Sequence, residues 1–592
     1  MKTKYLFIIL ILIFSISYSN SQWIYIHGYQ TYGLTGNHNY VFEGAIDGVY
    51  RSSNYGNTWN HSLNSPAIMP VLEIGSYVYA TPDGQGIFLS TNYGENWSQT
   101  TMNSGSIYSF AYSGPFLFAG TVYNGVYRSS DYGHNWVQTA FNNHTVSGLT
   151  AIGSYIFAAA EENVFRSSNY GQDWTPTSLN TQTISLVSNS NTVFSGTHHS
   201  GVLFSTNNGL TWIQTTLDSL CVYGMGIVGS NVFAGIWPNG THNNAGGVFL
   251  STDNGLSWNH KNEGMGNDEI TTIFVSRHYV YAGQPGVFRR SLCEILGTGH
   301  TVSGTITYRD NNQPVQSGYV NALYYDDSTS SIEIVDSTGI QSNGTFFLPH
   351  CPQDSLYIMV YQNDDNLNFV PTYHVSTVDW QQATQVYPGQ NLSNINIQVY
   401  RINNVNSPFM ISGQIHSGSG SQTNNVESAI IYAKIGNDFK NFGISQPDGS
   451  FNIDKLPAGN YTLTAYRIGY NRVSQNVSIT NENLANINFN FGYPIGVKSQ
   501  ETNYPGIYSL YQNYPNPFNP VTEIKYDLPA SSLVKISVYD ILGKEIAVLK
   551  NEKQSAGTYN VEWNASNFAS GVYIYKIETN GFIQSRKMVL IK

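Results

Sequence analysis

Acidic, imidazole and indole side chains that could act on a ligand recur in the first half of the chain, each between two short predicted strands. The candidates are Asp47, Asp83, Glu161, Glu162, His198, His199, Trp237 and His242. Two carboxylates that face one cleft could hydrolyse a glycosidic bond, and an exposed tryptophan could stack on a sugar or anchor a protein. The opposing interpretation is a solvated polar surface, so no catalytic residue is assigned.

A second set of residues recurs in the pattern Ser-x-Asn/Asp-x-Gly-x-x-Trp. Its Asn or Asp residues are Asn54, Asn92, Asp131, Asn169, Asn207 and Asp253, and its tryptophans are Trp59, Trp97, Trp136, Trp174, Trp212 and Trp258. The side-chain oxygen can accept backbone hydrogen bonds, and the glycine can take a positive φ. Only two of the six are Asp, although a metal ligand or an acid catalyst would need the charge. The pattern therefore predicts a structural brace, with the tryptophan covering its hairpin.

The spacing of this pattern predicts a repeat protein. The tryptophans follow one another at intervals of about 38 residues, with one longer interval before Trp258. Two short alternating strand patterns precede each turn, as in residues 40–53. Each unit therefore has about four strands, which is one blade of a β-propeller.

The two ends of the repeated region differ from the rest. Residues 279–291 have the paired strands of a seventh unit but no Ser-to-Trp turn, whereas residues 22–28 have a strand pattern without a preceding pair. We expect the N-terminal strand to complete the last blade, because a closed ring has no open sheet edge. The prediction is an all-β chain with a seven-bladed propeller over residues 22–291, followed by three β-sandwich domains.

The repeat resembles the Asp-box (BNR) repeats of sialidases, sortilin-like receptors, xyloglucanase-like glycosidases and photosystem II assembly factors. The resemblance implies the propeller fold and leaves the activity open. Sialidases hold the substrate carboxylate with three arginines, whereas Arg51, Arg128 and Arg166 occupy one repeated position before the turn. A sialidase is therefore disfavoured. A xyloglucanase-like hydrolase that uses carboxylates such as Asp47 and Asp83 is the alternative.

The candidate acids, histidines and tryptophan lie in the loops between the second and third strands of their blades, here called the rim loops. Because neighbouring strands are antiparallel, these loops lie on the face of the ring opposite the repeated turns. The longest insertion, residues 235–247, contains Trp237 and His242. The pair His198 and His199 has no further ligand that the sequence identifies, so no metal site and no cofactor are expected.

Composition narrows the classes of partner. Charged residues make up 11% of the 592 residues, the net charge is -11, and no lysine falls between Tyr5 and His260. No basic stripe can therefore neutralise phosphates, so nucleic acid is not expected as a partner. Cys221, Cys293 and Cys351 allow at most one disulfide, and the sequence leaves its pairing open.

The N-terminus predicts export. Residues 1–21 have a short basic start, an apolar run and small residues at the end, which is typical of a secretory signal peptide. No later run approaches the roughly 18 apolar residues of a membrane span, so the mature chain is not expected to cross a bilayer.

Three further domains follow the repeats. Alternating strands with Asp-Gly, Asn-Gly and proline turns predict sandwiches over residues 298–401, 408–492 and 507–592, with linkers at 403–408 and 492–506. The second sandwich resembles carboxypeptidase regulatory-like domains in Gly449, Phe451, Ile453, Leu456, Pro457, Gly459 and Tyr461, and the first looks like a diverged copy. The resemblance implies spacer or adhesive modules. Asp326 and Asp327 could bind calcium, but adjacent acids are more often solvated.

Residues 507–592 resemble the type A sorting domain of the type IX (Por) secretion system. The matching motifs are Asn-Pro-Phe-Asn-Pro at 516–520, Tyr-Asp-Ile-Leu-Gly at 539–543, Ser-Gly-Val-Tyr at 570–573 and Lys587-Met588 near the end. The resemblance implies recognition by the type IX machinery at the outer membrane, often followed by removal of the domain. We therefore expect a secreted or surface-attached protein.

The leading hypothesis is a non-enzymatic exported protein whose propeller binds a glycan or a protein through its rim loops. The rival is the carbohydrate-active hydrolase, and a third hypothesis is a structural component of the cell surface.

Overall fold

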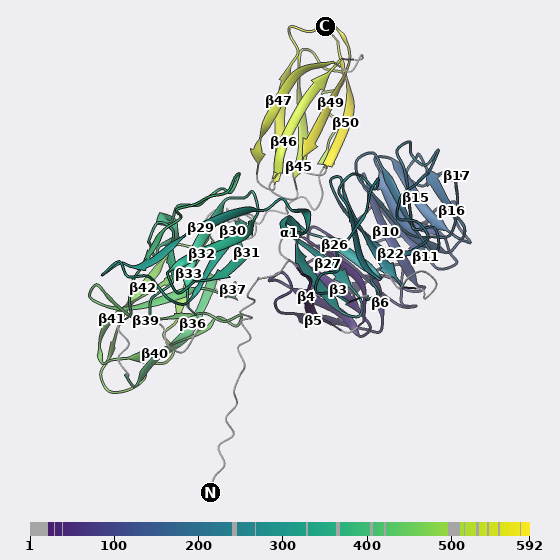
Figure 1. The fold of residues 1–592 in the computed structure, drawn as a ribbon. Coiled ribbons are helices and arrows are strands. Elements are labelled where there is room, and N and C mark those ends of the chain that lie inside the picture. Colours follow the sequence, from purple (N-terminus) through teal and green to yellow (C-terminus); the bar gives the residue numbers. More distant parts are fainter. Residues whose placement is uncertain are drawn as a thin grey trace. The chain divides into compact units, whose positions relative to one another are not determined.

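In the computed structural model the chain is built almost entirely from β-strands (Figure 1). The structure describes residues 22–592 except positions 29, 38–39, 239–245, 267, 327–329, 363–367, 403–406, 420–421, 495–508, 514, 529–531, 541–543, 555–556, 580–581 and 592. The predicted signal peptide and most of both predicted linkers therefore lie outside the described residues. No helix among the described residues is long and apolar enough to cross a membrane.

Seven four-stranded antiparallel sheets, here called blades 1 to 7, occupy the described residues from Ile24 to Ser291. Blades 1 to 3 contain β2 (Thr31–Gly36), β3 (Val41–Ala45), β4 (Gly48–Ser52) and β5 (Asn60–Asn64); β6 (Ile68–Ile74), β7 (Tyr77–Pro82), β8 (Phe88–Ser90) and β9 (Ser98–Gln99); and β10 (Ile107–Ser113), β11 (Phe116–Thr121), β12 (Val126–Ser129) and β13 (Val137–Gln138). Blades 4 and 5 contain β14 (Val146–Ile152), β15 (Tyr155–Ala160), β16 (Asn163–Ser167) and β17 (Thr175–Asn180); and β18 (Thr183–Ser188), β19 (Val193–Thr197), β20 (Val202–Ser205) and β21 (Ile213–Gln214). Blades 6 and 7 contain β22 (Cys221–Val228), β23 (Asn231–Trp237), β24 (Gly247–Ser251) and β25 (Asn259–His260); and β26 (Thr272–Val275), β27 (Tyr279–Gly283), β28 (Val287–Ser291) and β1 (Ile24–His27).

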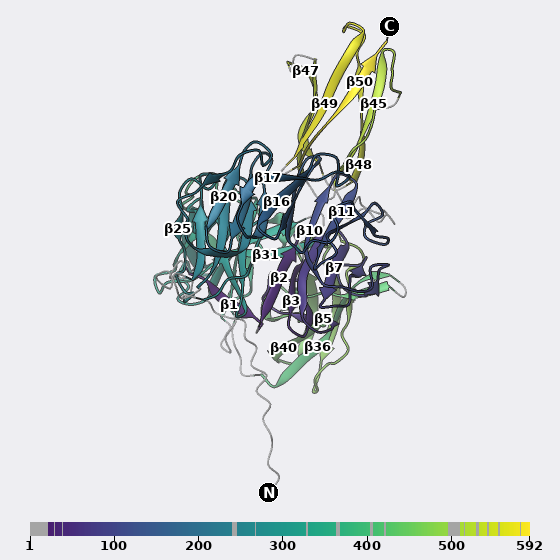
Figure 2. The same ribbon diagram turned by 90° about the vertical axis from the view of Figure 1, so that its right-hand side faces the viewer.

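The blades close into a ring. The innermost strands β2, β6, β10, β14, β18, β22 and β26 contact one another in this order, and β26 contacts β2. Figure 2 shows β2 and β10 towards the middle of the ring and β17 and β25 at its periphery. This arrangement is that of a β-propeller.

The N-terminal strand completes blade 7, as the sequence predicts. β1 pairs antiparallel with β28 in the register Ile24↔Arg289. Just before it, Trp23 is 2% exposed, and its indole N–H donates to the carbonyl of Lys261 at 2.5 Å. The ring is therefore closed by a strand from the opposite end of the repeated region. A short helix, α1 (Leu292–Leu296), follows β28 in the chain.

Neighbouring blades are joined by an aromatic residue that packs against the next Ser-to-Trp turn. In blade 1 this residue is the buried Phe42, and a Cβ added to Gly94 of blade 2 would lie 2.9 Å from its Cε1 atom. The same contact joins Tyr79 to Gly133, Phe118 to Gly171, Phe157 to Gly209 and Phe194 to Gly255. The turn glycine thus has a packing role as well as a positive φ.

Two sandwiches follow the ring. The first has sheets β32-β29-β35 and β31-β30-β33-β34, built from β29 (His300–Tyr308), β30 (Tyr319–Asp326), β31 (Ser331–Gly339), β32 (Thr345–Cys351), β33 (Leu356–Tyr361), β34 (Thr372–Tyr373) and β35 (Ile397–Val399), with the 3-10 helix η1 (Trp380–Gln382). The second has β37-β36-β40 with β43 beside β36, and β39-β38-β41-β42, built from β36 (Phe409–Ser419), β37 (Gln422–Asn425), β38 (Ile430–Ile435), β39 (Asp438–Ile444), β40 (Ser450–Leu456), β41 (Gly459–Tyr466), β42 (Val473–Ile479) and β43 (Phe489–Asn490). Asp326 is buried, which differs from the expected solvated pair, and Asp327 lies outside the described residues.

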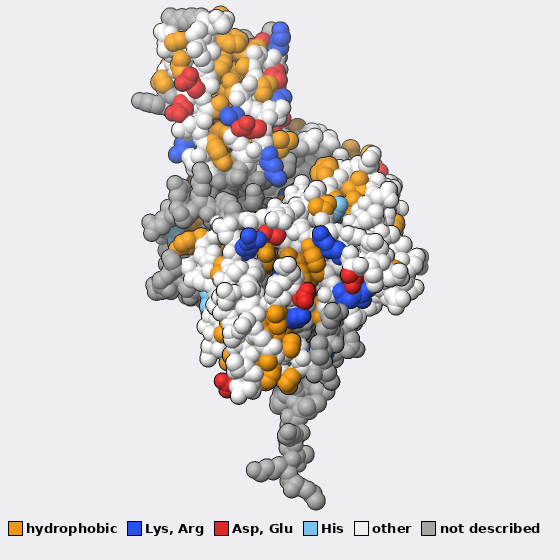
Figure 3. All heavy atoms as spheres, turned by 90° about the vertical axis from the view of Figure 1, so that its left-hand side faces the viewer, with side chains coloured by type: hydrophobic (Ala, Val, Ile, Leu, Met, Phe, Trp, Pro, Cys, Tyr) orange, Lys and Arg blue, Asp and Glu red, His pale blue; other side chains and the backbone are white. Residues whose placement is uncertain are grey.

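The two sandwiches form one compact unit. Val370 and Ile402 of the first share a buried apolar cluster with Ile430 and Tyr432 of the second, and the Tyr432 hydroxyl donates to the carbonyl of Pro371 at 2.7 Å. The face drawn in Figure 3 carries a few scattered charged side chains and several groups of hydrophobic ones, in agreement with the low content of charged residues.

The C-terminal sandwich repeats the same two-sheet plan. Its sheets are β44-β45-β48 and β47-β46-β49-β50, formed by β44 (Ser509–Leu510), β45 (Val521–Leu528), β46 (Ser532–Tyr539), β47 (Glu545–Gln554), β48 (Gly557–Asn564), β49 (Gly571–Thr579) and β50 (Phe582–Leu590). Trp563, Tyr575 and Met588 lie in the apolar cluster between the sheets.

Candidate functional site

The Ser-to-Trp turn has the same hydrogen bonds in six blades of the described ring. In blade 1, Oγ of Ser52 accepts from the backbone N–H of Gly56 at 2.8 Å, and Oδ1 of Asn54 accepts from that of Thr58 at 2.8 Å. Equivalent bonds are made by Asn92, Asp131, Asn169, Asn207 and Asp253. Asn and Asp make the same bond, so it needs an oxygen acceptor and no charge.

The turn tryptophans are partly buried, and most of their indole N–H groups have a partner. Trp59, Trp174 and Trp258 donate to the carbonyl of their turn glycine at 3.1 Å, while Trp97 and Trp212 donate to hydroxyl groups of the preceding blade. Trp136 differs, because its buried indole N–H has no partner among the described residues.

The three repeated arginines join neighbouring blades. Arg51, Arg128 and Arg166 donate at 2.8, 2.9 and 2.7 Å to the backbone carbonyls of Tyr93, Tyr170 and Asn208, each in the turn of the next blade. Each of these arginines therefore joins a different pair of neighbouring blades.

The four candidate acids are exposed and lie in rim loops of blades 1, 2 and 4. Asp47 accepts from the hydroxyl of Tyr50 at 2.9 Å, and Asp83 accepts from that of Ser106 at 2.5 Å. Glu161 pairs with Nδ1 of His144 at 3.1 Å, and Glu162 is its chain neighbour. Among the described residues no hydrogen bond joins two of these acids on different blades.

His198 and His199 lie in the rim loop of blade 5, whereas Trp237, expected in the rim loop of blade 6, is the last residue of β23 and is partly buried. Nδ1 of His198 lies 2.7 Å from Nε2 of His199, and burial together with His199 lowers the pKa of His198. The Trp237 ring lies 5.1 Å from the ring of Tyr223, while His242 falls outside the described residues. Within the described residues no group of three His, Cys, Asp or Glu side chains could hold a metal ion.

The three cysteines form no disulfide within the described chain. Cys221 and Cys351 are buried, and burial raises the pKa of the Cys221 thiol to about 11. A thiol of that pKa is protonated and a poor nucleophile at neutral pH.

A feature that the sequence analysis missed is a β-bulge near the rim end of the innermost strand in blades 1 to 6. The pairing register skips Tyr32, Tyr108 and Tyr223 in blades 1, 3 and 6. It also shifts at Met69 and Pro70, Ser147 and Ile184 in blades 2, 4 and 5. A bulge re-aims a side chain out of the strand alternation, and each of these residues is at least partly exposed.

Tyr123 is the most exposed of the large hydrophobic residues described, at 76%. It lies in the turn between β11 and β12 with a φ of 69°, a conformation that is rare for a bulky residue. Together with Tyr32, Tyr108, Tyr223 and Trp237 it forms a set that we call the aromatic rim. Its sequence signals are a tyrosine at the second or third position of three innermost strands and the Tyr-Asn-Gly turn.

The face that carries the aromatic rim has acidic charge. The rim loops contain Asp47, Asp83, Glu161 and Glu162 and no lysine or arginine. Such a surface attracts cations and repels anions over roughly a Debye length of about 8 Å.

The fold is that of a β-propeller followed by three sandwiches, and comparison with protein families adds the evidence on export. Residues 512–592 match the secretion system C-terminal sorting domain, and residues 126–139 match the BNR-Asp box repeat. The chain thus carries a type IX sorting domain and is delivered to the cell surface or the extracellular space. No curated protein matches it in sequence.

Solved structures resemble the chain only distantly. YCF48 from Cyanidioschyzon merolae is 14% identical, with a TM-score of 0.37 over 46% of this chain and 98% of that one. The extracellular domain of BT4673 from B. thetaiotaomicron is 12% identical, with a TM-score of 0.39 over 96% and 99%. The WD40 propeller domain of Doa1 is 10% identical, with a TM-score of 0.38 over 45% and 95%.

Proposed function

We propose that the chain is an exported binding protein whose aromatic rim holds an uncharged polysaccharide. The observation that carries this proposal is the set of aromatic side chains on one face, in which Tyr123 and Tyr108 are exposed and Tyr32, Tyr223 and Trp237 are partly exposed. A sugar ring presents an apolar C–H face that packs on an aromatic ring, and its hydroxyl groups hydrogen-bond with nearby polar side chains.

The charge of the rim supports a neutral ligand. Four exposed acids without a neighbouring lysine or arginine in the rim loops repel an anionic glycan or a phosphorylated partner. The local bonds of Asp47, Asp83 and Glu161 favour binding over hydrolysis, because a glycosidase needs two carboxylates roughly 5 to 10 Å apart that face one bond.

Delivery by the sorting domain fits this role, since it brings the chain to the cell surface or the extracellular space, where it can meet extracellular polysaccharides. The test is to present the mature chain, beginning at Gln22, with neutral and anionic polysaccharides and to measure both binding and release of reducing ends. We expect binding to neutral chains that Trp237→Ala weakens at least about fivefold, which is roughly 1 kcal/mol. Absence of binding, or a preference for anionic chains, would contradict the proposal, and release of reducing ends would favour the hydrolase.

A further inference from the structure

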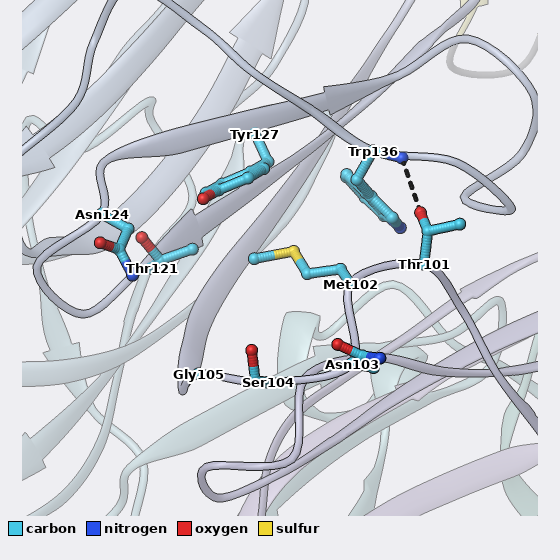
Figure 4. Close-up of a pocket in the computed structure, with 9 residues that line it drawn as sticks. All are labelled: Thr101, Met102, Asn103, Ser104, Gly105, Thr121, Asn124, Tyr127 and Trp136. Atoms are coloured by element: carbon cyan, nitrogen blue, oxygen red, sulfur yellow. Dashed lines mark hydrogen bonds between the residues drawn. The ribbon is translucent and has the colours of Figure 1, made fainter.

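A pocket of about 200 Å³ lies in the groove between blades 2 and 3. Its floor is the segment from Thr101 to Gly105, which links the two blades, and the turn after β11 forms the opposite side with Asn124 (Figure 4). The side chain of Met102 reaches into the space between the rings of Tyr127 and Trp136.

The next groove around the ring, between blades 3 and 4, fills the equivalent space with aromatic rings. There the position of Met102 is taken by Phe141, and the position of Gly105 by His144. The Phe141 ring lies 5.0 Å from that of Trp174 and stacks on that of His144 at 4.3 Å.

The groove between blades 2 and 3 keeps the outer walls of this arrangement and lacks its two inner rings. Tyr127 replaces Phe165, which lies 4.8 Å from Phe141, and Trp136 replaces Trp174. The unpartnered indole N–H of Trp136 is a second sign of looser packing, because Trp174 donates to a carbonyl. The pocket therefore lies where the neighbouring groove has the rings of Phe141 and His144, because Met102 and Gly105 have no ring at these positions.

The chemistry of the walls indicates what can occupy that space. None of the lining residues is charged. The side chains of Asn103, Ser104 and Asn124 and the hydroxyl of Tyr127 form no hydrogen bond with any described residue, so all four can bind a ligand. A ligand with a flat apolar face and several uncharged hydroxyl groups would satisfy both the rings and these polar groups.

We propose that this pocket holds one pyranose unit of a neutral polysaccharide, in the place that the rings of Phe141 and His144 fill in the next groove. This inference rests on the proposed function and assigns it a subsite. An aromatic side chain of a peptide would leave the amides and hydroxyls of the walls unpaired, and a charged sugar would lie without a counter-charge. Tyr123 precedes Asn124 in the same turn, so it offers an aromatic face to the adjoining sugar unit.

The first variant reproduces the packing of the neighbouring groove. Met102→Phe, made in the chain from Gln22, fills the pocket with the ring that stands at the equivalent position of the neighbouring groove. Binding is measured by calorimetry with hexasaccharides of β-1,4-glucose, β-1,4-xylose, β-1,4-mannose and α-1,4-glucose. We expect Met102→Phe to weaken binding at least about tenfold without lowering the melting temperature, and Asn124→Ala to weaken it about tenfold by loss of a hydrogen-bonding group.

The matched control is Phe141→Met, which opens the neighbouring groove. It should lower the melting temperature and leave binding unchanged. Wild-type affinity in both Met102→Phe and Asn124→Ala would overturn the pocket assignment, as would an equal loss in Phe141→Met or binding of aromatic peptides in place of sugars. If Trp237→Ala weakens binding while the pocket variants do not, the proposed function stands and the subsite fails. If the wild-type chain binds no sugar, both fail.

Discussion

At the scale of single residues, equivalent positions in the repeat serve as internal controls. Trp136→Phe and Trp174→Phe remove the same N–H group from two neighbouring blades. Trp174 loses a 3.1 Å bond to the carbonyl of Gly171, whereas Trp136 loses no bond to the described residues. We expect Trp174→Phe to cost about 1 kcal/mol more in free energy of unfolding than Trp136→Phe. Urea unfolding of both variants measures the difference, and equal costs would show that the indole bond contributes nothing.

Glu73, near the end of β6, gives the ring a dependence on pH. Burial raises the pKa of its carboxyl to about 7, against the opposing hydrogen bond that Asn37 donates at 2.8 Å. The unfolded chain therefore loses this proton at a lower pH than the folded chain. Between about pH 4.5 and pH 7 the free energy of unfolding should fall as the pH rises.

Glu73→Gln tests this prediction. The variant should become more stable relative to the wild type as the pH is raised from 4.5 to 8, because the glutamine has no proton to lose. Thermal melts across that range measure the effect, with the exposed Glu162→Gln as the control. A stability difference that stays constant with pH would refute the role of Glu73.

At the scale of elements, the ring depends on the contact between the second strand of one blade and the turn of the next. Gly94→Ala should lower the free energy of unfolding by about 2 to 4 kcal/mol, because the new Cβ meets Phe42 at 2.9 Å and the residue has a φ of +76°. Gly84→Ala provides the control, since Gly84 has a φ of +73° and no atom within 4 Å of the added Cβ. Similar losses in both variants would assign the whole cost to the backbone.

The strand pairs, the turns and the closing strand could be predicted because each leaves a local signal. The alternation of Gln22 to Gly28 and the missing last strand after Tyr279 are visible in the sequence. The bulge at Tyr108 could not be predicted, because one skipped residue in the pairing leaves the apolar pattern nearly intact. The pocket was missed for a related reason: Met102 and Phe141 are both apolar, and only packing shows that one fills its groove and the other does not.

At the scale of the whole molecule, the two middle sandwiches are better described as one body than as two spacers. Tyr432 is 1% exposed and its hydroxyl donates to the carbonyl of Pro371 in the other sandwich, and desolvation lowers the pKa of the Arg467 guanidinium. Breaking such an interface costs both apolar burial and the hydrogen bond. The two sandwiches should therefore unfold together.

The sorting domain directs the export of the chain. Its strand order indicates which deletion would disrupt its fold. β49 pairs with both β46 and β50, and the Tyr575 hydroxyl donates to the carbonyl of Tyr511 at 2.7 Å. Deleting residues 570–592 removes β49 and β50 and leaves β46 with an open edge, so the domain should not fold. We expect the truncated protein to accumulate in the periplasm, while a chain with Trp237→Ala is exported normally. Cell fractionation measures both, and normal delivery of the truncated chain to the surface or the medium would mean that export does not depend on this domain.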